Sequence, residues 1–564
     1  VANNQETDRN FNDAIISDRA MREIYLKGFE IIVKESQPWS IMSSYNKING
    51  TYVAENKELL TDILRGEWGF KGLVMTDWFG GDQPASMVAA GNDLLEPGTK
   101  IQWDALIEAS ENGKLTEEKI NASVRRILSI ILQSKKMQNY VYTNNPDLEK
   151  HAKISRESAS EGMVLLKNNK TLPIPKSLNV ALFGVTSFDF IAGGTGSGDV
   201  NEAYTVSLEE GLMNAGFELN ILSKKLFEIH KESNKKQFIK PDGLSAVLNP
   251  YFPPRISYTK EELQEIVASS DIGIITIGRN SGEGGDRVKN DDFLLSDKEK
   301  NNIEQVCSAY HAAEKKVIVV LNIGGVIETA SWKEKPDAIL LAWQGGQEGG
   351  NAVADILIGK VNPSGKLPMT FPVNLQDHAS NANFPLEGGM MDLTKFLFPS
   401  KYEKSENDKI KNKDFTNYDE GIYVGYRHFD KSELEVSFSF GYGLSYTEFS
   451  LSDLTLSLEN HRLKLGVTVT NEGSVSGKEV VQVYSSKPDT SIDRPVQELR
   501  SFAKTQSLNP DESVKIKIEI PLSQLSYWSE ETSKWVLEKG MYIIKVGNSS
   551  RDTFLTEQFE INED

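Results

Sequence analysis

Two acidic residues follow strand-like segments of the chain at points where a carboxylate could react with a substrate. Asp77 comes directly after the segment GLVMT, on the side of a parallel βα series where barrel enzymes keep their catalytic groups. Glu283 stands between glycines in SGEGGDR, after the apolar segment IGIITIG, and such glycines let the backbone turn sharply and present one carboxylate. The alternatives are a helix N-cap or ion pair for Asp77 and a solvated turn for Glu283.

Polar and aromatic side chains are expected beside Asp77. Tyr45 could hydrogen-bond its carboxylate, and Trp78 offers an apolar face of the kind that stacks on sugar rings, with a core or rim tryptophan as the alternative. The strand PWSIMSSYN would bring hydroxyl and amide groups to the same end, where they could bind a polyhydroxylated substrate. The residues that it contributes are Met42, Ser43, Ser44, Tyr45 and Asn46.

A glycine-rich segment, GGTGSGDV at 193–200, is unlike a phosphate-binding loop. It lacks the Gly-Lys-Ser/Thr ending of a Walker A loop and the placement of a dinucleotide fingerprint. We predict a tight loop that brings backbone groups and Ser197 toward a neutral ligand. The six histidines show no metal-ligand spacing and the chain has no EF-hand loop, so we predict neither a catalytic metal nor another cofactor.

The elements before residue 138 alternate between helix and strand patterns. Residues 1–137 are therefore predicted to be the C-terminal part of a (β/α)8 barrel. Its first long helix, which Ser17 could cap, should bury Met21, Ile24, Phe29 and Ile32. Only three strand signals occur where a closed barrel needs eight, so we expect the natural protein to carry further N-terminal sequence.

Four further segments follow. Residues 138–154 are a polar linker, and 155–375 are predicted to form an α/β sandwich domain because its strands are continuous apolar runs. Residues 376–430 form an irregular connecting segment. Residues 431–564, with period-two alternation, indicate a fibronectin type III-like β-sandwich. The predicted fold class is thus multidomain, α/β plus all-β.

Composition narrows the partners of the protein. A formal charge of -19 without a Lys/Arg stripe argues against nucleic acid, and no apolar run is long enough to cross a membrane. The single cysteine, Cys307, lies in a helix-like stretch and is predicted to be a buried core thiol. The N-terminus shows no signal-peptide pattern, so the compartment stays open, with a cytoplasmic location favoured over a periplasmic or secreted one.

Several segments together resemble glycoside hydrolase family 3, and the resemblance covers nearly the whole chain. They are NNQETDR, MSSYNKINGTYVAEN, LRGEWGFKGLVMTDW, EGMVLLKN, GGTGSGDV, SGEGGDR, WQGGQEGGNAVADILIGKVNPSGKLP, EGIYVGYR and FSFGYGLSYTEF. The resemblance implies a barrel domain, an α/β sandwich and a C-terminal fibronectin type III domain. It also implies a retaining, exo-acting β-glucosidase that acts on β-glucosides and cello-oligosaccharides, with a homodimer as one arrangement left open.

The resemblance implies a role for each candidate residue. Asp77, in T-D-W where the family has S-D-W, would be the nucleophile, and Glu283 would be the general acid/base. Glu283 must then hold a proton, so its pKa should be raised by burial or by a neighbouring negative charge. Arg9 would bind sugar hydroxyls and Tyr45 would support the nucleophile. The remaining pocket residues would be Met42, Trp78 and Ser197. The family's Lys-His pair, and an aspartate and an arginine before it, precede the segment that matches Val1 onward and are not part of this chain.

Two other functions remain open on the sequence. One is a β-xylosidase or a related exo-glycosidase of the same family, because pocket specificity rests partly on residues that are not in this chain. The other is a non-catalytic carbohydrate-binding protein, which the incomplete barrel suggests and the presence of Asp77 and Glu283 opposes.

Overall fold

The computed structural model describes residues 1–241, 251–384 and 414–562, in two compact units. The first unit comprises Val1–Pro146, Ser380–Val424 and Tyr527–Val536. The second comprises Asp147–Ala379, Gly425–Ser526 and Leu537–Asp564. Residues 385–413 of the segment predicted to be irregular lie outside the described residues.

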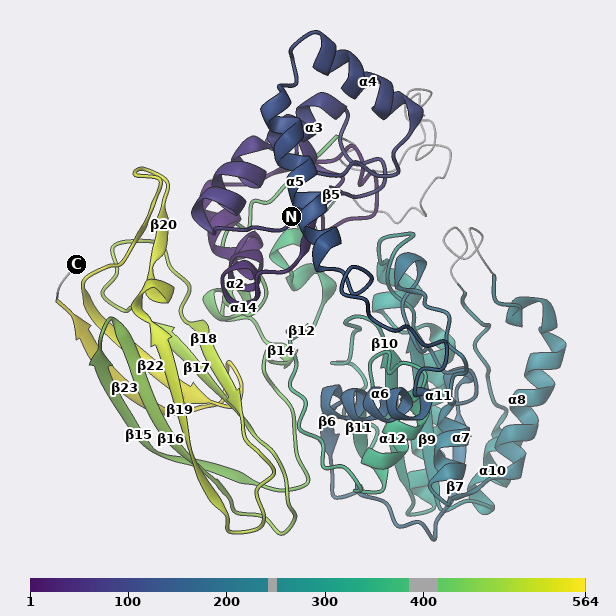
Figure 1. The fold of residues 1–564 in the computed structure, drawn as a ribbon. Helices are drawn as coiled ribbons and strands as arrows, with labels where there is room; N and C mark the ends of the chain where they lie inside the picture. Colours follow the sequence, from purple (N-terminus) through teal and green to yellow (C-terminus); the bar gives the residue numbers. More distant parts are fainter. Residues whose placement is uncertain (242–250, 385–413, 563–564) are drawn as a thin grey trace. The chain divides into compact units, whose positions relative to one another are not determined.

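The first unit contains short parallel strands and the helices that connect them (Figure 1). Strands β2 (Ser40–Ser43) and β5 (Leu73–Thr76) pair in parallel, and Met75 forms a further parallel bridge with Leu94. A second sheet has the order β13-β1-β3-β4, with bounds Phe415–Asn417, Asp13–Ile15, Lys47–Ile48 and Thr51–Tyr52. A hairpin joins β20 (Tyr527–Ser529) and β21 (Lys534–Val536). No closed barrel is formed by the described strands of this unit.

The helices of the first unit begin where the sequence predicted the first of them, after Ser17. Ser17 caps the first of them by accepting a hydrogen bond from the backbone N–H of Ala20. The α-helices are α1 (Asp18–Ala20), α2 (Lys27–Ser36), α3 (Pro84–Ala90), α4 (Lys100–Glu111) and α5 (Glu117–Gln133). Shorter or wider helical turns are η1 (Met21–Tyr25), η2 (Val53–Glu55) and η3 (Glu58–Glu67).

The predicted buried face of the first long helix is confirmed at Met21, which is buried, but is wrong in the second half of the helix. Phe29 and Ile32 are 36% and 51% exposed, whereas Leu26 and Val33 are buried. The reason is the π-helical turn η1, which holds more residues per turn than an α-helix. It therefore shifts the face that a 3.6-residue spacing would extrapolate along α2.

A buried ionic cluster fixes the strand that leads to Asp77. The Asp93 carboxylate is inaccessible to solvent and lies 2.7 Å from Arg65 Nη2 and 2.8 Å from Arg126 Nη1. It also accepts a hydrogen bond of 2.9 Å from the backbone N–H of Val74, in β5. Because a buried carboxylate needs such partners, this cluster ties β5 to the helices η3 and α5.

The α/β part of the second unit is built on one sheet of six strands. Its order is β6-β11-β10-β9-β7-β8, parallel except for β6. The bounds in that order are Val164–Asn168, Ala338–Leu341, Lys316–Ile323, Ile272–Arg279, Asn179–Phe183 and Glu218–Leu219. The helices are α6 (Leu148–Gly162), α7 (Leu208–Asn214), α8 (Ile221–Ser233), α10 (Lys260–Ala268), α11 (Asp297–Ala312) and α12 (Gly349–Leu357). The four apolar runs NVALFGV, IGIITIG, KKVIVVLNIGG and AILLAWQGG, from which the sequence predicts strands, form β7, β9, β10 and β11, and β6 and β8 are additional.

Apolar residues cover this sheet on both faces, which explains the continuous apolar runs in its strands. One core contains residues of α10 and α11, and the other contains residues of α7 and α12. Cys307 lies in the first core and is buried, as predicted. Burial raises the pKa of its thiol to about 12, so the thiol stays protonated and unreactive near neutral pH.

The C-terminal part of the second unit is a β-sandwich, as the alternating pattern predicted. One sheet has the order β15-β16-β19, with bounds Phe449–Glu459, Arg462–Asn471 and Ser513–Pro521. The other has the order β18-β17-β22-β23, with bounds Glu498–Lys504, Val480–Ser486, Gly540–Gly547 and Thr553–Ile561. Alternate residues of facing strands fill the core between the sheets. Before it lie the pair β12 (Phe371–Pro372) and β14 (Val436–Phe438), and α14 (Tyr426–Lys431).

None of the helices in the described ranges has both the length and the apolar character that a membrane span requires.

Candidate active site

Asp77 lies immediately after β5, and two donors hold its carboxylate. Its Oδ1 accepts hydrogen bonds of 2.7 Å from the Tyr45 hydroxyl and 2.7 Å from the backbone N–H of Trp78. The backbone N–H of Asp77 donates to the carbonyl of Ser43, which continues the β2–β5 pairing. The carboxylate is thus oriented through one oxygen, which is the arrangement a positioned nucleophile needs.

The guanidinium group of Arg9 lies over the Tyr45 ring. Its guanidinium carbon lies 4.7 Å from the centroid of the Tyr45 ring, and its Nη1 lies 2.9 Å from Glu6 Oε2. Both Arg9 and Tyr45 are buried. The structure therefore joins three of the predicted residues, Arg9, Tyr45 and Asp77, in one contiguous group.

Two residues predicted to face a substrate are used inside the protein instead. The Ser43 hydroxyl is buried and donates to Asn92 Oδ1 at 2.9 Å. The Asn46 amide is buried and donates to the carbonyls of Ala2 and Lys47. Alternate residues of a strand point to opposite faces, so a strand end delivers only part of its side chains to one site.

Trp78 and Met42 present apolar surface near the nucleophile candidate. Their side chains are 59% and 56% exposed, and the Trp78 ring meets Phe79 edge to face at a centroid distance of 6.4 Å. Met42 is paired in register with Met75 across β2 and β5. Exposed aromatic and thioether groups beside a carboxylate suit a ligand that has apolar faces and polar edges, such as a sugar.

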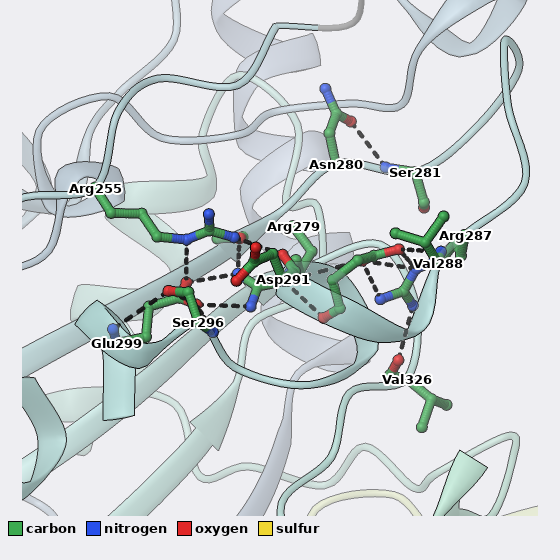
Figure 2. A network of polar contacts seen from close by, with 12 residues as sticks. Arg255, Arg279, Asn280, Ser281, Arg287, Val288, Asp291, Ser296, Glu299 and Val326 are labelled. Carbon is green, nitrogen blue, oxygen red and sulfur yellow. Dashed lines mark hydrogen bonds and ion pairs between the residues drawn. The ribbon is translucent and has the colours of Figure 1, made fainter. Parts of the chain in front are cut away.

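In the second unit, Glu283 lies on a loop that follows β9. Two arginines anchor this loop, Arg279 before Glu283 and Arg287 after it, and Figure 2 shows their contacts. At the end of β9, the buried Arg279 donates to both carboxylate oxygens of Glu299, at 2.6 and 2.9 Å. After the loop, Arg287 pairs with Asp292 and donates to the carbonyl of Val326 at 2.7 Å. Both ends of the Glu283 loop are therefore fixed to the α/β core.

The glycine-rich segment 193–200 lies against this loop. Thr195 and Gly282 form an isolated parallel bridge, and the Thr195 hydroxyl donates to the Glu283 carbonyl at 2.7 Å. The backbone N–H of Ser197 donates to Glu283 Oε2 at 2.8 Å. The predicted tight loop is thus present, and it brings Ser197 to the acid/base candidate.

A polar pocket of about 150 Å³ adjoins the same two segments. Its lining includes Gly193, Thr195 and Asn280, together with Asp189 and Lys240, whose charged groups lie 3.5 Å apart. Polar side chains and backbone groups around a small cavity are suited to hydroxyl groups of a ligand. Among the described residues, no group of three or more His, Cys, Asp or Glu side chains is arranged to hold a metal ion.

The ion pairs of Glu299 predict a pH-dependent stability. Burial alone would raise the pKa of Glu299, but the hydrogen bonds and charge of Arg279 and the charge of Arg255 outweigh burial and lower that pKa. A lowered carboxyl pKa contributes stability above the ordinary value of 4.5, and the contribution is lost as the pH falls through the folded-state pKa. We expect Glu299→Gln to reduce the free energy of unfolding by about 3 kcal/mol at neutral pH, because it removes the carboxylate that accepts two hydrogen bonds from the buried Arg279.

Urea denaturation at neutral pH and at about pH 3.5 would measure the difference in unfolding free energy between the variant and the wild type. This difference should be smaller at the lower pH. The matched control is Glu304→Gln on the same helix, since Glu304 forms a solvent-exposed ion pair with Lys335. This substitution should change the unfolding free energy by about 0.5 kcal/mol or less. An equal loss at both pH values would contradict the ionic explanation.

Sequence reasoning missed the residues that hold the two carboxylates in place. The sequence predicts no role for Asp93, Thr195 or Arg279, although each fixes a segment that carries a candidate residue. The position of Arg279 at the end of an apolar strand could have predicted a buried ion pair, since a buried arginine needs an anion. Thr195 offered no such signal, because its partner is 88 residues away in the chain.

Comparison with known proteins covers all parts of the chain. Residues 3–130 match the glycosyl hydrolase family 3 N-terminal domain, and residues 163–446 match the C-terminal domain of that family. Residues 479–550 match the fibronectin type III-like domain. These matches and the structural neighbours confirm the predicted fold class, mixed α/β with a C-terminal fibronectin type III-like β-domain.

Individual proteins match along most of their length. Thermostable β-glucosidase B of Acetivibrio thermocellus is 33% identical over 571 aligned residues, covering 100% of this chain and 68% of that protein. An exo-α-(1→6)-L-arabinopyranosidase of Bifidobacterium breve is 32% identical, covering 98% of this chain and 67% of its own length. The structure of β-glucosidase 3B from Thermotoga neapolitana in complex with α-D-glucose superposes with a TM-score of 0.90 at 42% identity, covering 100% of this chain and 76% of that one.

Proposed function

This chain belongs to glycoside hydrolase family 3, as its motifs predicted, and we propose that it is a retaining, exo-acting β-glucosidase. It would hydrolyse terminal, non-reducing β-D-glucosyl residues of β-glucosides and cello-oligosaccharides. The observation that carries this proposal is the Asp77 carboxylate, oriented by Tyr45 and the Trp78 backbone beside an exposed indole ring. The relatives named β-glucosidase support the choice of glucose.

In the first step, Asp77 attacks the anomeric carbon of the glucosyl residue. We assign the attack to Oδ2, because Oδ1 already accepts two hydrogen bonds. As the new C–O bond forms, the bond to the leaving oxygen breaks and Glu283 gives its proton to that oxygen. The products are a free alcohol, a covalent glucosyl-Asp77 ester and an ionised Glu283.

In the second step, Glu283 acts as a base. It removes a proton from water, whose oxygen attacks the anomeric carbon and displaces Asp77. Each step inverts the anomeric centre, so the glucose is released in the β configuration. Glu283 ends protonated and Asp77 ionised, as at the start.

The other predicted residues would shape the sugar site. In this proposal Trp78 and Met42 cover the apolar face of the glucosyl ring, and Arg9 contributes to binding of the sugar hydroxyls. Ser197 lies next to Glu283 and would face the leaving-group side. An exposed ring at Trp78 supports stacking.

A second candidate is an exo-glycosidase of the same family that acts on pentopyranosides. The relative from Bifidobacterium breve, whose name describes an arabinopyranosidase, favours keeping it. Pentopyranosides, including xylosides, lack the hydroxymethyl group of glucose, so a pocket that closes around that position would select for them.

Hydrolysis of matched aryl glycosides tests the proposed function. Initial rates would be compared on 4-nitrophenyl β-D-glucoside, β-D-xyloside and α-L-arabinopyranoside, and the first-formed sugar would be followed by proton NMR. We expect the highest kcat/KM on the glucoside and β-glucose as the first product. Preference for a pentoside would select the second candidate, and first-formed α-glucose would rule out retention. Binding of glucosides without turnover would identify a carbohydrate-binding protein.

A further inference from the structure

The backbone of Glu283 is held on both sides by one residue of the glycine-rich segment. The backbone N–H of Glu283 donates to the Thr195 carbonyl at 3.3 Å, and the Thr195 hydroxyl donates to the Glu283 carbonyl at 2.7 Å. The Thr195 N–H donates to the Ser281 carbonyl at 3.2 Å, which continues the backbone pairing between the two segments. Thr195 is buried, so these bonds are shielded from water and hold more strongly than exposed ones.

The next residue, Gly196, lets the two segments approach closely. It has a φ of +64°, and a Cβ placed on it would lie 2.3 Å from Glu283 Cβ and 2.7 Å from Oε2. A side chain at this position would therefore push the Glu283 side chain away. The close approach allows the Ser197 N–H to reach Oε2 at 2.8 Å.

These hydrogen bonds act together on Glu283. Thr195 holds its backbone, and the Ser197 N–H donates to its carboxyl group. We propose that Thr195 is the positioning residue of the general acid/base, holding Glu283 so that its carboxyl group meets the leaving oxygen. The inference rests on the proposed function, since it assigns a role within that reaction. Thr195 itself touches no reacting atom in this scheme, and it acts only through Glu283.

Misplacing an acid has a characteristic kinetic signature. A poor leaving group such as phenol or methanol needs a proton as the bond breaks, whereas 2,4-dinitrophenolate leaves without one. Loss of acid positioning therefore slows poor leaving groups selectively. A purely structural defect lowers the fraction of active enzyme and slows all substrates by the same factor.

The test measures kcat/KM for a series of aryl β-glucosides from phenyl to 2,4-dinitrophenyl. We expect Thr195→Val to lose about tenfold on the phenyl substrate and about twofold or less on the dinitrophenyl substrate. Thr195→Ser keeps the hydroxyl and should match the wild type. Equal losses across the series, or no loss on the phenyl substrate, would overturn the positioning role.

A second pair of variants tests the same point without touching the hydroxyl. Gly196→Ala should show the same leaving-group selectivity, because its methyl group would collide with Glu283. Gly198→Ala is the matched control, since no atom lies within 4 Å of a Cβ placed there. If Thr195→Val does not fold, this pair decides the question, and equal losses for Gly196→Ala on all substrates would again overturn it.

Failure of the positioning role and failure of the proposed function give different experimental results. Turnover of phenyl β-glucoside by the wild type, with azide rescue of Glu283→Ala, establishes the function by itself. If these controls succeed and the Thr195 and Gly196 variants lose activity uniformly, the positioning role fails and the function stands. If the wild type shows no acid-dependent glucoside hydrolysis, the function fails, and the positioning role that rests on it is overturned as well.

Discussion

Replacing Asp77 by asparagine is expected to lower kcat on aryl β-glucosides by about 10⁴-fold or more, because an amide cannot form the covalent glycosyl intermediate. Asparagine preserves the size of the side chain and can still accept the hydrogen bonds from Tyr45 and the Trp78 N–H. The fold should therefore be retained, and circular dichroism and the urea-unfolding midpoint would verify it. Steady-state rates measure the loss.

Covalent labelling gives the same prediction an independent readout. A 2-fluoro β-glucoside with a good leaving group should attach to Asp77, and peptide mass spectrometry would locate the modified residue. Asp104→Asn is the matched control, because Asp104 is exposed on α4 and forms an ion pair of 2.7 Å with Lys100. A label on another residue, or an Asp77→Asn enzyme with more than about one hundredth of the wild-type rate, would reject Asp77 as nucleophile.

Replacing Glu283 by alanine should reduce kcat/KM on phenyl β-glucoside by about 10²- to 10⁴-fold, the usual contribution of a general acid. The loss should be much smaller for a 2,4-dinitrophenyl glucoside, whose departure needs no proton. Hydrolysis of the glycosyl intermediate then becomes limiting, because no base activates water. Rates on both substrates, measured against Glu261→Ala on the exposed start of α10, would show this difference.

Azide distinguishes the two carboxylates by the product that it forms. With Glu283→Ala, azide should attack the glycosyl-Asp77 intermediate and give β-glucosyl azide. With Asp77 removed as alanine, azide would enter once from the opposite face and give the α-azide. Proton NMR assigns the anomer directly. Absence of β-azide and of rate recovery for Glu283→Ala would remove Glu283 as the acid/base.

Much of the fold could be predicted because the signals are local. The strands β7, β9, β10 and β11 are continuous apolar runs, and covering helices bury both of their faces. The C-terminal sandwich follows a period of two, as in Leu463 and Leu465, which are both buried. Such patterns depend only on neighbouring residues, so they survive without knowledge of the partner strand.

Long-range pairing could not be predicted in the same way. The segment Phe415–Asn417 joins β1 as the parallel strand β13, although its surroundings in the sequence are polar and charged. Its Thr416 hydroxyl lies 2.7 Å from Gln5 Oε1 and 3.1 Å from Asn12 Oδ1, and both residues are distant in the sequence. A three-residue strand buries too few side chains to leave a periodic signal, and its place is decided by the backbone donors that it satisfies.

The two candidate carboxylates show the same difference between what local sequence determines and what the tertiary structure decides. Chain order and motif alone predict Asp77 after a barrel-type strand and Glu283 on a glycine-flanked loop, because each position follows from the residues beside it. Only the tertiary structure decided which groups hold them: Tyr45 on Asp77 Oδ1, and Thr195 and Ser197 on Glu283. Hydrogen-bond partners are chosen by the distance and direction between folded segments, and neither quantity is encoded in local spacing.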